Sequence, residues 1–528
     1  MKRWLCLLTL LTASMAPLSA QTVDPPIDID RLKEKPIAVG GGKVGELLRQ
    51  WWKEGTASGN AGDVYDNRDG DHSPLNLTPW PQMSAIKYSK DDIKLFKHWA
   101  AQRVIVPHVT FGNSSTSAPA HLGGSNPRSY YVSARGLAFL YEEYTRNNLY
   151  IYPEHRDHDP GHNGRGDGYG DMYPTNTPYL IISQGSSGSD QPFMRMMPYV
   201  LAAFRPEVKK KLTETGTLMP TIQMLFRSTN KHLKDPKEYL TGKAHPTVFE
   251  GSWVDDLAIV QKAHALELNA LPPMVQLRVV EEDKAINGLD YHDLVSTEVL
   301  ADTPACIARI HRSKAYKRRI VVSAEPSFDV NKSKLTYTWV ILRGDPDKIK
   351  IVPKKDDQSV AEITVAWHDR RPVSPGSPLE SNRVDIGVFV HNGTHYSAPG
   401  FVTFCTLDRE ARTYNKDGKL LDIGHGMGET EIRITDWGML FANIIGDDPW
   451  AANLLQVSDD EKQFIFSAAI RNRLGTLIAL PPAQKELTDA ETAFKNSNDA
   501  TEKEKAKKRL DGARQRVAEV QKASKANL

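Results

Sequence analysis

The densest run of side chains that could do chemistry lies between residues 155 and 171. Three histidines and four aspartates occur there: His155, Asp157, His158, Asp159, His162, Asp167 and Asp171. Imidazole nitrogens and carboxylate oxygens are ligands of zinc, whereas carboxylate oxygens alone suit calcium. Pro160 and several glycines argue against a helix, so neighbouring ligands would have to converge within a loop. The pattern predicts a loop that holds zinc or calcium.

Two other interpretations of this loop stay open. Asp and His side chains in a loop also hydrogen-bond their own backbone, which holds the loop together without a metal. The same residue types can act as metal-free acids and bases, because an unperturbed histidine titrates near neutral pH. If the loop is catalytic, the residues nearest the reacting bond would be these four: His155, Asp157, His158 and Asp167.

A second acidic loop spans residues 63–72. It alternates oxygen-bearing side chains around Gly70, which is typical of calcium-binding loops. However, Arg68 stands where a third ligand is needed, and no glutamate closes a twelve-residue loop. This segment is therefore the weaker calcium candidate.

A glycine- and serine-rich turn at 184–190 separates a strand-like run from a helix-like run. A nucleophile elbow requires Gly-x-Ser-x-Gly, but in Gly185-Ser-Ser-Gly188 the second glycine comes one residue early. Backbone N–H groups at the helix start could instead attract an anion. The simplest interpretation is that Ser189 or Asp190 caps the helix. The sequence assigns no catalytic residue and no organic cofactor.

The elements that would position these loops form a first domain over residues 42–270. Apolar residues at helical spacing predict helices at 44–52, 133–146, 193–204 and 253–268. Strand-like runs occupy 103–109 and 179–183, and long polar loops lie between them. Long loops in a compact domain are more often functional than not. We expect an α+β domain.

After a connecting region at 271–318, the chain becomes rich in short strands over 319–425. Runs at 319–323, 335–343, 359–367, 384–391 and 400–407 are separated by turn residues. Asn392-Gly393 is the strongest short hairpin signal in the chain. Strands of this length and spacing predict a β-sandwich.

Part of this region resembles the polycystic-kidney-disease (PKD) type of immunoglobulin-like domain. The resemblance rests on Ser323-Ala-Glu-Pro-Ser-Phe-Asp329, Leu335-Thr-Tyr-Thr-Trp339 and Arg343-Gly344-Asp345. Pro346 departs from the usual Gly-Asp-Gly turn of that family. The resemblance implies a spacer or binding module rather than a reaction, and a fold alone does not define chemistry.

The remainder of the chain is expected to be helical. Residues 426–480 include Ser458-Asp-Asp-Glu461, a capping box ahead of an apolar run. Residues 481–528 predict a helical hairpin or coiled coil, because apolar residues recur at spacings of three and four: Leu487, Ala490, Phe494, Leu510, Ala513, Val517 and Val520. The apolar seams are short, so the hairpin needs a partner or is a solvated tail.

The N-terminal residues, the charge balance and the cysteines indicate the compartment and the kinds of partner of the protein. Residues 1–20 have the three-part pattern of a cleavable export signal, followed by a polar leader at 21–41. Lys+Arg number 67 and Asp+Glu 65, so nothing indicates a nucleic-acid or membrane surface. No later segment is apolar enough for a membrane span. Outside the signal, Cys306 and Cys405 could form one disulfide or remain two thiols.

Two functional hypotheses follow for a periplasmic or extracellular protein. In the first, it binds extracellular glycan or protein through metal-stiffened loops and the β-sandwich. In the second, the first domain is a hydrolase or lyase that acts on an extracellular polysaccharide. The residue pattern does not decide whether the protein is an enzyme.

The export signal gives the first testable prediction. Produced with its leader in a bacterial host, the protein should lose about 20 residues, because signal peptidase cleaves after small residues such as Ala20. N-terminal sequencing of the exported form should begin at or near Gln21. Recovery of exported protein that still begins with Met1 would contradict this prediction.

Overall fold

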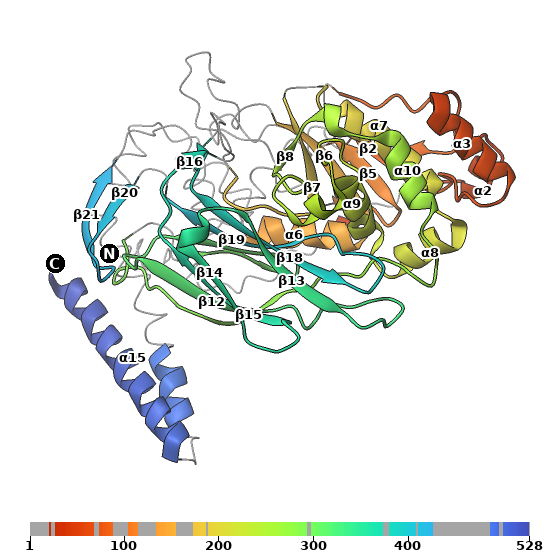
Figure 1. Cartoon of the computed structure of the whole chain (residues 1–528). Coiled ribbons are helices and arrows are strands. Elements are labelled where there is room, and N and C mark those ends of the chain that lie inside the picture. The colour runs from red at the N-terminus through yellow and green to blue at the C-terminus, as the bar shows by residue number, and fades with distance from the viewer. Residues whose placement is uncertain are drawn as a thin grey trace, which may run out of the picture.

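The computed structural model describes the chain in several stretches. The described residues are 21–22, 27–67, 73–87, 104–113, 134–154, 173–185, 188–292, 297–372, 380–407, 410–425, 486–495 and 500–526. They form a multidomain α/β protein with a parallel sheet in the N-terminal half, further sheets after it, and helices at the C-terminal end (Figure 1).

The N-terminal half is built on a parallel sheet. Its strands are β2 (Val64–Asn67), β3 (Ser84–Ala85), β5 (Thr110–Asn113), β6 (Asn148–Glu154), β7 (Leu180–Gln184) and β8 (Val248–Phe249). They lie in the order β3-β2-β5-β6-β7-β8, and every neighbouring pair is parallel. The predicted mixture of helices and strands is therefore confirmed, but parallel pairing makes the class α/β rather than α+β.

Helices connect and cover these strands. Their bounds are α2 (Ile29–Lys33), α3 (Gly42–Lys53), α6 (Ala134–Thr145), α7 (Gln191–Ala203), α8 (Pro206–Glu214), α9 (Leu218–Ser228) and α10 (Asp256–His264), with 3-10 turns η3 (Pro236–Leu240) and η4 (Gly251–Trp253). Helix α7 is almost wholly buried and packs against α3 and α10. Helix α6 contacts both β6 and a strand of the second domain, β10.

The second domain consists of two sheets. One has the order β10-β11-β19-β18-β13 and the other β14-β15-β12-β9. The strand bounds are β9 (Arg278–Glu282), β10 (Val299–Thr303), β11 (Cys306–His311), β12 (Lys317–Ser323), β13 (Thr336–Arg343), β14 (Ile349–Pro353), β15 (Val360–Ala366), β18 (Arg383–His391) and β19 (Gly400–Thr406), with the 3-10 turn η5 (Pro346–Lys348) before β14. Neighbouring strands are antiparallel except for the parallel pair β11 and β19.

An apolar core lies between these two sheets. Val322 and Ile363 come from one sheet, and Val388 and Val402 come from the other. All four are fully buried because alternate residues of each strand point toward the facing sheet. The strands predicted after residue 319 are present. The expected connecting region, 271–318, itself supplies β9, β10 and β11 to the two sheets.

Short pairs complete the described secondary structure. They are β1 (Gln21–Thr22) with β4 (Val104–Ile105), β16 (Arg371–Pro372) with β17 (Glu380–Ser381), and β20 (Glu410–Tyr414) with β21 (Leu420–His425). The last pair is fastened to the second domain by Arg412, whose guanidinium stacks 3.9 Å from the centre of the Trp367 ring.

The C-terminal helices agree with the predicted hairpin. Residues 486–495 are helical, and α15 (Ala500–Ala526) lies beside them. Ala490 packs against Leu510 and Ala513, with Leu487 and Phe494 at the edge of the contact. The expected helical segment 426–480 lies outside the described residues. Within the described part of the chain, no helix combines the length and apolarity that crossing a bilayer requires.

The two cysteines are not linked by a disulfide. Cys306 lies opposite Phe401 and Cys405 lies opposite Ile310 in the β11–β19 pair, so the cysteines are four residues apart along the sheet. Four residues of strand span roughly 13 Å, well beyond the Cα separation that a disulfide allows. Burial also raises the pKa of the Cys306 thiol to about 12, which makes it unreactive.

The two domains share one core rather than meeting at a loose contact. Buried residues of the parallel sheet and its helices are continuous with Ala301, Cys306 and Phe389 of the second domain. Tyr179, which precedes β7, contacts both domains. Its ring packs against Tyr144 of α6, with 5.4 Å between ring centres. Its hydroxyl lies 2.6 Å from Thr303 Oγ1 and accepts a hydrogen bond from Ala305 N–H at 3.2 Å.

Tyr179 and Tyr144 provide a matched pair of substitutions. Both rings are buried, but the Tyr144 hydroxyl has no hydrogen-bond partner among the described residues. Tyr179→Phe should lower the free energy of unfolding by about 1–3 kcal/mol, because it removes the acceptor of a buried N–H group. Tyr144→Phe should leave it nearly unchanged. Denaturant unfolding of both variants checks this, and equal losses would contradict it.

Candidate functional site

The order of the parallel strands creates a switch point between β2 and β5. From β2 the chain continues to β3 on one side, and it later returns to β5 on the other side. Ligands of open α/β sheets bind outside the carboxyl ends of the strands at such a point. Because all the strands are parallel, the ends of β2, β5, β6 and β7 lie along this one edge, which we call the carboxyl edge (Figure 1).

A buried carboxylate lies at this edge. In register, Asp66 of β2 lies beside Gly112 of β5, which lies beside Tyr150 of β6. The Tyr150 hydroxyl donates a 2.6 Å hydrogen bond to Asp66 Oδ2 across the intervening strand. A Cβ at Gly112 would lie 3.0 Å from Tyr150 Cε1 and 1.9 Å from the Asp66 carbonyl oxygen. Only glycine therefore permits this contact, and Asp66 and Tyr150 are both buried.

The opposite face of the same strands carries a second polar set. The Tyr65 hydroxyl donates to Asn113 Oδ1 at 2.8 Å and accepts from Leu75 N–H at 2.9 Å. Ser73 then joins this set to the start of α7, because its hydroxyl accepts from Gly188 N–H at 2.7 Å and its carbonyl accepts from the Gln191 amide at 2.9 Å. The ends of β2, β5 and β7 are thereby held in fixed relative positions.

The turn between β7 and α7 uses its glycines for backbone conformation. Gly185 and Gly188 have φ values of 112° and 96°, which favour glycine. Ser189 Oγ lies 2.9 Å from Ser183 Oγ. Asp190 occupies the N-cap position, but its backbone is helical and its side chain makes no capping hydrogen bond. The predicted cap is therefore wrong for Asp190, because a capping side chain requires extended backbone. Ser186 lies outside the described residues.

Asp63 is not part of the carboxyl edge. It precedes β2 and pairs with Lys209 of α8, whose Nζ lies 2.8 Å from Asp63 Oδ2. Asn60 donates to the same oxygen at 2.9 Å. Three residues of extended chain, roughly 10 Å, separate Asp63 from Asp66, so the two carboxylates cannot share an ion in the way that the calcium-loop interpretation of 63–72 requires. Asp69, Asp71 and His72 lie outside the described residues.

The predicted metal residues all fall in a segment that the structure does not describe. These residues are His155, Asp157, His158, Asp159, His162, Asp167 and Asp171. Their segment directly follows Glu154, the last residue of β6, and therefore begins at the carboxyl edge. Among the residues that are described, no group of three or more His, Cys, Asp or Glu side chains could hold a metal ion.

The sequence analysis did not single out Asp66, Asn113 or Tyr150. Asp66 and Asn113 are near or at the end of short strands, in Val-Tyr-Asp-Asn and Thr-Phe-Gly-Asn, whereas Tyr150 is an early residue of the longer strand β6. For Asp66 and Asn113, the sequence signal that could have identified them was a polar residue at the end of a buried strand. It was hidden because β2 and β5 have only four residues each and lie next to long polar loops.

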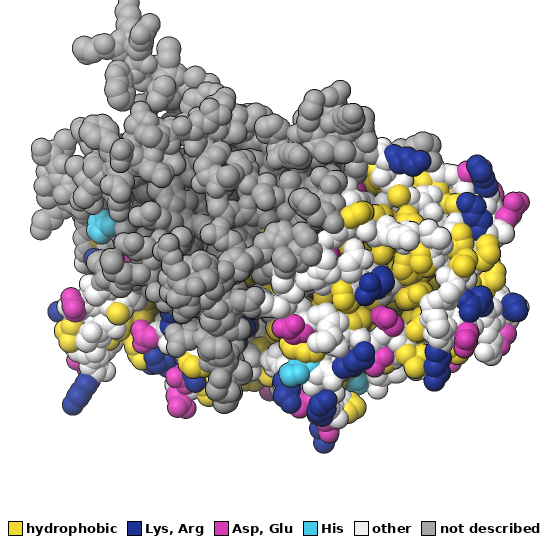
Figure 2. Space-filling model, turned by 90° about the horizontal axis from the view of Figure 1, so that it is seen from above, with side chains coloured by type: hydrophobic (Ala, Val, Ile, Leu, Met, Phe, Trp, Pro, Cys, Tyr) yellow, Lys and Arg dark blue, Asp and Glu magenta, His cyan; other side chains and the backbone are white. Residues whose placement is uncertain are grey.

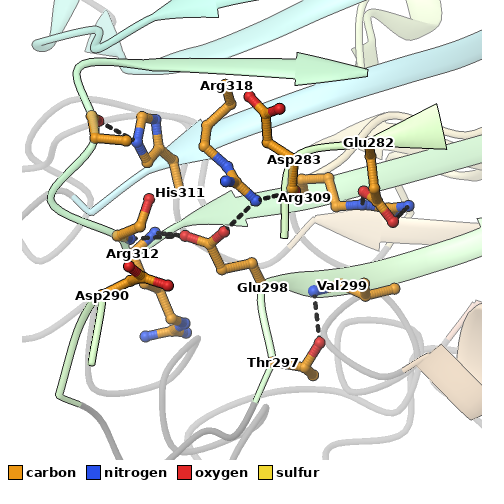
Figure 3. A network of polar contacts seen from close by, with 12 residues as sticks. Glu282, Asp283, Asp290, Thr297, Glu298, Val299, Arg309, His311, Arg312 and Arg318 are labelled. Carbon is orange, nitrogen blue, oxygen red and sulfur yellow. Dashed lines mark hydrogen bonds and ion pairs between the residues drawn. The ribbon is translucent and has the colours of Figure 1, made fainter. Parts of the chain in front are cut away.

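A second polar cluster lies in the second domain around Glu298 (Figure 3). The Glu298 carboxylate accepts from the backbone N–H groups of Arg312 and Ser313 at 2.6 and 2.7 Å, and it pairs with Arg318 at 2.6 Å. Arg309 pairs with Glu282 at 2.7 Å. These carboxylates are thus engaged by cations or backbone donors that tie β9, β10, β11 and β12 together, which fits a structural role.

The described residues on one face of the molecule carry charges of both signs. On the face shown in Figure 2, Lys and Arg side chains are scattered among Asp and Glu side chains, with hydrophobic side chains between them. This agrees with the near balance of 67 basic and 65 acidic residues.

Comparison with known proteins adds little. No protein-family profile matches the chain, and no curated protein is similar to it. A solved structure that is similar to this chain is described as a nucleoside hydrolase-related hypothetical protein from Saccharophagus degradans that is associated with carbohydrate metabolism. It is 9% identical, with a TM-score of 0.20, and the match covers 65% of this chain and 99% of that one. At these values the similarity carries no argument about fold or function.

Proposed function

We propose that this is a secreted hydrolase whose α/β domain binds a saccharide at the carboxyl edge, with Asp66 as the central catalytic carboxylate. The observation that carries the proposal is the Asp66–Tyr150 contact across Gly112 at the switch point of the sheet. A buried carboxylate held in one orientation by a phenol can accept a proton from a substrate hydroxyl or from water.

The chemistry around Asp66 suits a polyhydroxylated ligand. Tyr150 places an aromatic ring beside the Asp66 carboxylate, and on the opposite face of the same strands Tyr65 and Asn113 add a second ring and an amide. Rings pack against the apolar faces of sugars, while carboxylate and amide groups hydrogen-bond hydroxyl groups. The substrate class in this proposal is therefore an extracellular polysaccharide or a fragment of one.

A role as a binding protein without catalysis is the second candidate. It is favoured by the β-sandwich, for which we retain the proposal of a PKD-type immunoglobulin-like module. Tyr337 and Trp339, which belong to the motif of the resemblance, lie on β13, and both pack against the core between the sheets. Modules of this kind act as spacers or binding domains, so glycan binding without turnover would fit them.

Asp66→Asn distinguishes these two functions. The amide has nearly the same shape and can still accept from Tyr150, so the fold should persist. If Asp66 is the general base, kcat for reducing-sugar release from soluble polysaccharides should fall by about 10²- to 10⁴-fold. The expected KM change is small, because the substitution removes proton transfer rather than contact area.

Asp63→Asn, directly before the strand that carries Asp66, is the matched control. Asp63 is also buried, but it pairs with Lys209 at the opposite end of β2, so its loss should lower the melting temperature and spare kcat. Both variants are assayed at a temperature where circular dichroism shows them folded. A folded Asp66→Asn protein with wild-type kcat would exclude the catalytic role. Wild-type protein that binds oligosaccharide in calorimetry but never cleaves it would favour the binding protein.

We further propose that residues 155–171 hold a zinc or calcium ion next to this edge. Support comes from the residue types and from Glu154, which ends β6 at the carboxyl edge immediately before them. A cation there would stabilise negative charge that develops on a substrate, and its ligands would be His nitrogens and Asp oxygens.

Elemental analysis tests the metal proposal. Protein purified without chelator should contain about one zinc or calcium ion per chain, and His158→Ala or Asp157→Ala should abolish it, because either change removes a ligand. His232→Ala is the control, since that imidazole stacks on Trp253 with 4.7 Å between ring centres. Substoichiometric metal in the wild-type protein after mild dialysis would overturn the proposal.

A further inference from the structure

The segment that leads into β7 is buried along its whole length. Residues 173–179 carry the chain from the undescribed segment 155–172 to β7, and the side chains of Tyr173, Thr175, Asn176 and Tyr179 are at most 1% exposed. A buried, irregular segment must find hydrogen-bond partners for its backbone outside any helix or sheet. In this protein several of those partners come from the second domain.

The first of these partners is Arg383, the first residue of β18. Its side chain is 1% exposed, and its Nη1 donates to the carbonyl oxygen of Tyr173 at 2.5 Å. Its Nη2 donates to the hydroxyl of Thr247, which stands directly before β8. One guanidinium of the sandwich therefore binds two points of the α/β domain that flank β7.

Arg383 is itself held in place within the sandwich. Its Nε donates to Asp385 at 3.0 Å, and Asp385 also accepts from the Thr403 hydroxyl at 2.9 Å. Asp385 is 2% exposed, so the pair is desolvated and its charge-assisted hydrogen bonds are strong. A lysine could pair with Asp385, but its single ammonium lacks the fork that reaches three acceptors in different directions.

Two further contacts secure the same segment. Thr175 Oγ1 lies 3.3 Å from the thiol of Cys306, and this thiol donates to the Asn176 carbonyl at 3.6 Å. The Tyr179 hydroxyl bonds Thr303 and the Ala305 N–H group. From Tyr173 to Tyr179, the approach to β7 is thus fixed by β10, β11 and β18 of the sandwich.

We propose that Arg383 is a positioning residue for the carboxyl-edge site, and that the sandwich is a structural part of this site rather than a spacer. This inference rests on the function proposed above. By holding the Tyr173 carbonyl, Arg383 sets where the chain enters β7, and β7 lies next to β6, the strand that carries Tyr150. Displacement of residues 173–179 would therefore disturb the Tyr150–Asp66 contact.

Full-length Arg383→Lys and Thr403→Val test the inference as a matched pair. Arg383→Lys keeps a cation beside Asp385 but loses the bonds to Tyr173 and Thr247. Thr403→Val removes a hydrogen bond to the same carboxylate from inside the sandwich and leaves the α/β domain untouched. Amide hydrogen exchange of residues 148–154 and 173–184 should become about tenfold faster in Arg383→Lys and stay at the wild-type rate in Thr403→Val.

Kinetics provide the second readout. In Arg383→Lys, kcat for polysaccharide hydrolysis should fall about tenfold or more with little change in KM, because misplaced groups lose transition-state contacts first. In Thr403→Val both constants should stay near wild type. If Arg383→Lys behaves like Thr403→Val in exchange and in kcat, the inference is overturned. Failure of the proposed function would look different, since wild-type protein and Asp66→Asn would then be indistinguishable in turnover.

Discussion

Parallel pairing of β2, β5, β6 and β7 is the constraint on which the rest of the architecture depends. In a parallel sheet, every connection must return the chain to the same end, so all the strands finish at one edge. The long polar segments after these strands therefore all start there, although they are far apart in the sequence. Register then places Asp66, Gly112 and Tyr150 in one row, and the missing side chain of Gly112 lets the outer two touch.

Local patterns in the sequence were sufficient to predict many elements but not the site. Helical periodicity located α3 and α7, and short β-branched runs located β7, β12 and β18. The Asp66–Tyr150 contact joins residues 84 positions apart, and neither side chain has a distinctive local context. Strand β10 was missed because a charged, exposed position interrupts its short apolar pattern. Long-range register decides such features, and short windows of sequence do not contain it.

The predicted N-cap of α7 shows why residue type alone misleads. Asp190 has a favoured capping side chain and stands at the correct position, yet its φ and ψ of −73° and −20° are helical. The turn before it is shaped by Gly185 and Gly188 and by the contacts of Ser73 with Gly188 and Gln191. These tertiary contacts determine how the chain enters the helix, so they override the local preference.

The Arg383–Asp385 pair fixes the relative position of the two domains more narrowly than an apolar contact in its place could. Burying two charges costs desolvation energy, and well-packed apolar residues in their place are often equally stable or more so. An apolar contact, however, tolerates small shifts, whereas a guanidinium that bonds Asp385, Thr247 and the Tyr173 carbonyl accepts only one arrangement of the two domains. We therefore interpret the pair as a device for specific alignment. If stability alone were required at this contact, the continuous apolar core that surrounds it would have been sufficient.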